Sequence, residues 1–245
     1  MRKIPPSLDE KGKIVYNRGM EFEVIAHIHT DFKEKFGIPR QSGLTDLKGK
    51  IIFVPKYRNK DALRGIEGYS HLWLLWEFSE AIRSEWSPTV RPPKLGGNTR
   101  VGVFATRSPF RPNPVGLSSV SLEKVDYNDP EGPVLFVAGV DLLDGTPIYD
   151  VKPYLPYTDA HPEAKSGFAV PFSQGLDVSF PQELLALVPF EKRSALLTAL
   201  KEDPRPSYQD DPKRVYGMRF AGLEIKFSVQ GNLLTVLSVQ KKSSY

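Results

Sequence analysis

The chain of 245 residues is long enough for one large domain, or for one domain with a small second one. Its composition, 40% hydrophobic and 25% charged, is that of a soluble globular protein, and its net charge of only +4 means that nucleic-acid binding would need clustered arginines. It contains no cysteine, which excludes disulfides, thiolate metal sites and a cysteine nucleophile.

Residues 1–20 are charged and show no periodicity, and they predict a mobile N-terminal lead-in. This segment has no apolar signal region, and no stretch of the chain approaches the ~20 apolar residues of a membrane span. We therefore expect a cytoplasmic protein that does not enter a membrane.

Between residues 21 and 160, short β-branched and apolar runs are separated by turn residues and not by helices. The expected strands are 22–28, 51–54, 71–78, 102–106, 119–125, 134–140 and 148–151. A helical turn is expected within 58–65, and long loops at 31–44 and 84–98. Strands spaced in this way indicate an all-β barrel or a sandwich.

The character of the chain changes after residue 160. A Pro- and Gly-containing linker is expected around 156–175, followed by a leucine-rich helical segment at 181–201 that Pro189 breaks. After a Pro-rich loop, the runs 223–229 and 233–239 flank Gln-Gly-Asn and predict a hairpin. Residues 161–245 therefore read as a linker and a small α+β C-terminal domain.

Residues 102–118, GVFATRSPFRPNPVGLS, form the most distinctive stretch. We expect the short run 102–106 to be a buried strand that ends where the polar residues begin. The three prolines that follow fix the backbone, so the loop presents Arg107, Arg111 and Asn113 stiffly. A rigid connector with solvated arginines is the competing interpretation.

Six further motifs accompany this loop in order: PRQ at 39–41, YSHLW at 69–73, RPPKLGGN at 91–98, DLLDGTP at 141–147, DVKPYLP at 150–156 and DPRP at 203–206 with Tyr208. Together they resemble the TsaA-like (TrmO) family of tRNA methyltransferases, from about residue 22 to the C-terminus. The resemblance implies a mainly β protein: a single-sheeted β-barrel at 21–160 that binds S-adenosylmethionine, with the small C-terminal domain after it. It also implies a homodimer with a shared site. The implied reaction is methylation of N6 of the threonylcarbamoyl-modified adenosine 3′ of the anticodon, with the tRNA anticodon stem-loop as partner.

The same resemblance implies a set of cofactor-binding residues. These are Pro39, Arg40, Gln41, Ser70, His71, Arg107, Leu117, Asp144, Gly145, Thr146 and Pro147. Arginine can hold a carboxylate in a bidentate pair, and a carboxylate can pair with an amino group, as this cofactor requires. On local chemistry alone, Asp-Gly-Thr-Pro is also a plain hairpin turn, and His71 is also an ordinary strand-end histidine.

Asp150, Lys152 and Tyr154 fall on one side of an extended segment. We expect them at the rim of the cofactor pocket, with Tyr154 stacking on a base and Asp150 or Tyr154 as candidate general base. An edge strand with polar residues facing water is the alternative. Arg91 and Lys94 are expected to contact RNA or to be merely solvated, and Arg111 and Asn113 to reach a neighbouring subunit's site.

His27 and His29 would share a strand face, but two histidines without a third ligand seldom bind metal, so no metal is expected. Walker A and G-x-G-x-x-G motifs are absent, which disfavours a Rossmann-type methyltransferase. A non-catalytic module that binds S-adenosylmethionine or a nucleoside, and an RNA-binding protein without chemistry, remain the alternatives.

Overall fold

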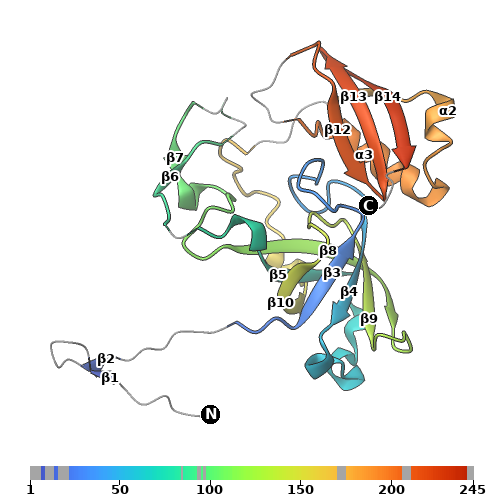
Figure 1. Cartoon of the computed structure of the whole chain (residues 1–245). Helices are drawn as coiled ribbons and strands as arrows, with labels where there is room; N and C mark the ends of the chain where they lie inside the picture. The colour runs from blue at the N-terminus through green and yellow to red at the C-terminus, as the bar shows by residue number, and fades with distance from the viewer. Residues whose placement is uncertain are drawn as a thin grey trace.

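The computed structural model describes residues 7–8, 14–15, 22–83, 85–92, 95, 98–169, 175–205 and 211–241 (Figure 1). Its centre is a closed antiparallel barrel of six strands in the order β10-β3-β4-β9-β8-β5. The strands are β3 (Ala26–Thr30), β4 (Lys48–Phe53), β5 (His71–Glu77), β8 (Val115–Asp126), β9 (Val134–Ala138) and β10 (Thr146–Pro153). The expected single-sheeted barrel is thereby confirmed, and the sandwich is excluded.

Alternation of side chains builds the barrel core. In β5, Leu72 and Leu74 are fully buried, whereas His71 and Trp73 point outward. Ile28 of β3 and Ile148 of β10 fill the same interior. These strands therefore present one apolar face to the core and one face to their surroundings, whereas β9 is buried at four of its five residues.

The expected strand at 102–106 is wrong. The backbone pairs only over β7 (Val101–Gly102), against β6 (Thr89–Val90), and then turns into a short 3-10 helix, η6 (Val103–Ala105). Of this run Val103 is buried, while Phe104 is 72% exposed. The apolar letters suggested a core strand, but no neighbouring strand continues the pairing.

The C-terminal domain is a four-stranded sheet with helices, as expected. The sheet order is β11-β14-β13-β12, from β11 (Asp177–Ser179), β12 (Tyr216–Phe220), β13 (Leu223–Gln230) and β14 (Leu233–Lys241). The leucine-rich segment forms α2 (Gln182–Leu185), the 3-10 helix η7 (Phe190–Lys192) and α3 (Arg193–Lys201). Pro189 separates them as predicted, because it cannot continue a helix.

The loop after β3 joins the barrel to the C-terminal domain. The rings of Phe32 and Phe220 lie 5.3 Å apart, and the Ala221 N–H donates to the Asp31 carbonyl at 3.1 Å. Lys192 pairs with Asp31 at 2.5 Å. These contacts give the two parts one continuous apolar core.

Smaller elements complete the described chain. They are β1 (Ser7–Leu8), β2 (Ile14–Val15), η1 (Pro55–Tyr57), η2 (Lys60–Leu63), η3 (Ile66–Gly68), η4 (Ser79–Ala81) and α1 (Pro156–Asp159). The helical turn expected near residue 60 is η2, and α1 lies in the expected linker. Most of the expected mobile lead-in is outside the described residues. In the part of the chain that the structure describes, no helix is long and apolar enough to span a membrane.

Candidate functional site

The outer face of β5, β8 and β10 carries several of the expected site residues. Strand register sets Trp73 beside Lys152, and Leu75 beside both Leu117 and Asp150. Together with α1 these strands line a groove of about 340 Å³ formed by Trp73, Leu117, Lys152, Thr158, Asp159 and His161. We call it the β5–β8 groove.

Aromatic rings border the β5–β8 groove. The Tyr154 ring lies 5.4 Å from that of Trp73 and 6.1 Å from that of His71. Trp73 Nε1 donates to Asp159 at 2.8 Å, which fixes the indole, and Ser70 Oγ lies 3.0 Å from His71 Nδ1. The face therefore offers flat apolar surface of the kind on which a base or an adenine ring stacks.

Two charged groups lie along the same face. Lys152 Nζ pairs with the Asp150 carboxylate at 2.7 Å, and the Val151 N–H donates to the same carboxylate at 2.9 Å. These two contacts hold Asp150 in place beside the aromatic rings. Asp150 and Lys152 are thus paired, and Lys152 and Tyr154 both lie beside Trp73.

A second cluster brings Gln41 and Arg107 together. The Arg107 guanidinium donates to Gln41 Oε1, and the Ser119 N–H donates to Ser42 Oγ at 3.2 Å. The loop that carries PRQ is thereby held against β8. Arg40 points elsewhere: its guanidinium donates to carbonyls of the C-terminal domain, those of Asp203 at 3.2 Å and Arg205 at 3.0 Å.

The DGTP segment forms the tight turn that its local chemistry predicts. Gly145 has φ +78°, a conformation that glycine adopts without strain. The Thr146 hydroxyl donates to the Leu143 carbonyl at 2.7 Å, and Pro147 pairs with His27 of β3. The turn is therefore rigid, and it leads directly into β10.

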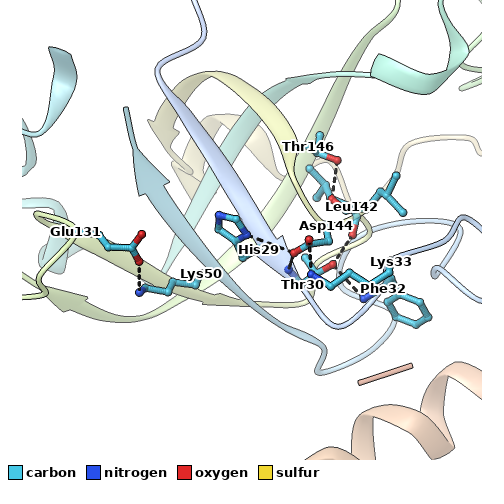
Figure 2. Close-up of polar contacts among 10 residues, drawn as sticks. His29, Thr30, Phe32, Lys33, Lys50, Glu131, Leu142, Asp144 and Thr146 are labelled. Atoms are coloured by element: carbon cyan, nitrogen blue, oxygen red, sulfur yellow. Dashed lines mark hydrogen bonds and ion pairs between the residues drawn. The ribbon is translucent and has the colours of Figure 1, made fainter. Parts of the chain in front are cut away.

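The Asp144 carboxylate faces β3 (Figure 2). It accepts hydrogen bonds from the Thr30 N–H at 3.0 Å and from Lys33, and it lies 3.4 Å from His29 Nδ1. Burial opposes the charged form, but the hydrogen bonds from Lys33 and Thr30 and the charges of Lys33 and His29 outweigh it, so the pKa of Asp144 is lowered. Asp144 is therefore a preformed anion.

Asp144 lines a groove different from the first. This β3–β4 groove, of about 380 Å³, is formed by His29, Thr30, Asp31, Lys33, Lys48, Gly49, Lys50, Phe136, Asp144 and Lys192. Its lysines are ion-paired, for example Lys50 with Asp129 at 3.2 Å and Glu131 at 3.0 Å. Leu117 and Asp144, both expected at the cofactor, thus line different grooves of one subunit.

The Pro-rich loop is closed by its own arginine. Arg111 donates to the Thr106 carbonyl at 2.7 Å and to the Val103 carbonyl at 3.4 Å. The Asn113 carbonyl accepts from the Val115 N–H at 2.8 Å. Arg91 is exposed, and Lys94 lies outside the described residues. Arg111 thus ties the loop to its own backbone carbonyls.

Sequence reasoning missed two participants. Trp73 was placed on a strand, but its part in the β5–β8 groove depends on strand pairing with β10. Asp141 was noted only as the start of a motif; in the structure its carboxylate is mostly buried, and burial raises its pKa. The signal available for Asp141 was an acidic residue directly after an apolar run. Among the described residues, no group of three His, Asp or Glu side chains has a metal-binding arrangement.

A closed antiparallel barrel with open grooves on its outer face, followed by a small α+β domain, defines a β-barrel protein and not a doubly wound one. The chain belongs to the tRNA-methyltransferase O family: residues 27–160 match its N-terminal domain, and residues 169–242 match its C-terminal domain.

Individual relatives agree with this assignment. The tRNA (adenine(37)-N6)-methyltransferase of Escherichia coli is 41% identical over 220 residues, which cover 85% of this chain and 93% of the relative. The crystal structure of TrmO from Pseudomonas aeruginosa superimposes with a TM-score of 0.72 at 33% identity, and covers 91% of this chain and 99% of that one. A probable S-adenosyl-L-methionine-binding protein of Pyrococcus abyssi is 35% identical over 148 residues, 60% of this chain and 74% of the relative.

Proposed function

We propose that this protein transfers a methyl group from S-adenosylmethionine to N6 of the threonylcarbamoyl-modified adenosine at position 37 of tRNA. The observation that carries the proposal is the match to the E. coli tRNA (adenine(37)-N6)-methyltransferase over nearly the full length of both chains. Because tRNA is the proposed substrate, we assign the protein to the cytoplasm. We assign the chemistry to the barrel domain, residues 21–160, and the linker and accessory domain to residues 161–245.

The donor set suits the parts of S-adenosylmethionine. Arg107 offers a guanidinium for the carboxylate of the cofactor, and Asp144 offers an anion for its ammonium group. Leu117 is 57% exposed and offers an apolar surface for adenine. When bound, the cofactor supplies a methyl group that its positively charged sulfur has already activated. No metal is needed for this chemistry.

The β5–β8 groove suits the acceptor base. Trp73 and Tyr154 offer stacking surface, and Lys152 offers a charge for the nearby backbone of the anticodon stem-loop. The acceptor nitrogen belongs to a ureido group, and it becomes a better nucleophile when it loses its proton. Asp150, which Lys152 and the Val151 N–H hold in place, or the Tyr154 hydroxyl would take that proton.

We propose further that the active site is shared between two subunits of a homodimer. Asp144 and Leu117 line separate grooves of one chain, so one cofactor that uses both would take them from two chains. The β6–β7 region, to the left of the barrel in Figure 1, carries the exposed aromatics Phe104 and Trp86, whose rings lie 6.1 Å apart. Such a surface suits burial against a partner, with the Arg111 and Asn113 loop beside it.

Mixing two inactive variants tests the shared site. If Asp144→Ala and Arg107→Ala damage residues that serve one site from different chains, a mixed dimer has one intact site, and up to about half of the wild-type activity returns. If activity stays absent although subunit exchange is demonstrated, both residues serve the same chain's site. A monomer by light scattering contradicts the dimer directly.

Methyl transfer from isotopically labelled S-adenosylmethionine to bulk tRNA tests the reaction itself. Label in tRNA is the expected result. Cofactor binding without transfer would instead make the protein a sensor, and tRNA binding without cofactor affinity would make it an RNA-binding protein.

A further inference from the structure

Asp141 is a partly buried carboxylate that the proposed methyl transfer does not use. Its Oδ1 accepts a hydrogen bond from Ser118 Oγ at 2.7 Å, and Ser118 Oγ in turn accepts one from Trp76 Nε1 at 2.9 Å. Ser118 is 1% exposed and Trp76 is 7% exposed. Because the indole can only donate, the serine must give its single proton to Asp141. The hydrogen bond from Trp76 to Ser118 therefore requires a hydrogen-bond acceptor at position 141.

Maintaining this carboxylate is unfavourable. Burial raises the pKa of Asp141, against the hydrogen bonds from Ser118 and from the backbone of Asp141 and Ser42 and against the positive charge of Arg107. A core that needed only packing would hold an apolar residue here. Two of the groups that favour its charged form, Ser42 and Arg107, indicate why an acidic residue occupies this position.

Those partners belong to the proposed cofactor site. Ser42 directly follows Gln41, whose side chain accepts from Arg107. The loop is also held by the Gly43 N–H, which donates to the Gly139 carbonyl at 2.9 Å, two residues before Asp141. Ser118 also directly precedes Ser119, whose N–H donates to Ser42 Oγ at 3.2 Å. Asp141 and its hydrogen-bond donor Ser118 therefore adjoin the loop that carries Gln41.

We propose that Asp141 is a positioning residue, which fixes the Gln41–Ser42 loop and the Arg107 guanidinium in the orientation that receives the cofactor carboxylate. It acts through Ser118, which holds β8 against the Gln41–Ser42 loop, and through Gln41 on Arg107. It touches neither the methyl group nor the acceptor nitrogen. This inference rests on the proposed function, since it assigns Arg107 to the cofactor. Asparagine is the informative replacement, because its amide keeps the size of aspartate but loses the charge and turns one acceptor into a donor.

The experiment compares Asp141→Asn with Asp126→Asn, a control carboxylate at the end of β8 that pairs with Lys124 at 2.8 Å. Affinity for S-adenosylmethionine is measured by calorimetry, and kinetics are measured with tRNA. Asp141→Asn should weaken cofactor affinity about tenfold. It should raise KM for the cofactor and leave kcat at saturation within about threefold. Asp126→Asn should leave both unchanged.

A double-mutant cycle separates positioning from a general structural role. In an Arg107→Ala background, Asp141→Asn should change affinity by less than about twofold, since the group through which it acts is gone. The inference is overturned if the effects of Asp141→Asn and Arg107→Ala on cofactor affinity are fully additive. It is also overturned if Asp141→Asn lowers the melting temperature but leaves cofactor affinity unchanged. If Asp141→Asn shows no cooperative melting, Ser118→Ala replaces it, and unchanged affinity there also overturns the inference. Wild-type protein that binds the cofactor but transfers no methyl contradicts the proposed function alone, because the affinities still test Asp141.

Discussion

Gly116 of β8 lies opposite Trp76 of β5, and the two approach so closely that a methyl group at Gly116 does not fit. A Cβ added there would lie 2.3 Å from Trp76 Cε2 and 2.4 Å from Cζ2. The indole cannot move freely, because its ring packs 4.3 Å from that of Phe78 and its Nε1 donates to Ser118. Overpacking costs about 1–3 kcal/mol, and loss of the Trp76–Ser118 hydrogen bond adds about 1, so Gly116→Ala should destabilise by about 2–4 kcal/mol.

Urea denaturation measures this effect. With a slope of about 2–3 kcal/mol/M, the midpoint should fall by about 1 M while the slope stays the same. Gly68→Ala is the matched control, since a Cβ at Gly68 meets no atom within 4 Å. If Gly116→Ala stays within about 0.5 kcal/mol of wild type, the close approach of β8 to Trp76 is not as described.

Three further predictions concern the site. Arg107→Ala should weaken S-adenosylmethionine binding at least tenfold by calorimetry, about the loss of one charge-assisted contact, and unchanged affinity would remove Arg107 from the site. If Asp150 or Tyr154 is the general base, the corresponding variant, Asp150→Asn or Tyr154→Phe, should lower kcat by about 10²-fold or more. Near-wild-type kcat in both variants would show that neither residue is the general base. Because the pKa of Asp144 is lowered in the folded protein, its charge stabilises the fold at pH values above the usual pKa of 3.8. This stabilisation is lost as the pH falls through the lower pKa of the folded state. The free energies of unfolding of wild type and Asp144→Asn should therefore converge as pH falls from 6 to 3, and a constant difference would contradict the lowered pKa.

Local patterns predicted strands in both domains. The short, aromatic-rich apolar run of β5 indicated a barrel strand, and the two runs that flank Gln-Gly-Asn indicated the β13–β14 hairpin of the C-terminal sheet. Where the pattern was short, it misled: the run from Val103 to Ala105 is apolar, but it has no strand beside it and folds as η6. Pairing partners are distant in sequence, so the letters alone could not exclude a strand there.

The site was predicted only as a set of residues and not as an arrangement. Gln41 and Arg107 meet, whereas Arg40, which precedes Gln41 in the PRQ motif, reaches the carbonyls of Asp203 and Arg205. The division of Leu117 and Asp144 between two grooves follows from the strand order of the closed barrel. Such long-range relations depend on tertiary packing, which local periodicity does not record.

Nucleoside mass analysis of tRNA incubated with this protein and S-adenosylmethionine tests the proposed methyl transfer directly. Two tRNA preparations are compared, with and without the threonylcarbamoyl group on adenosine 37. We expect one added methyl group on N6 of the threonylcarbamoyl-modified adenosine, and none in the preparation that lacks the threonylcarbamoyl group. Methylation of any other nucleoside, or none at all by protein that calorimetry shows to bind the cofactor, would contradict it.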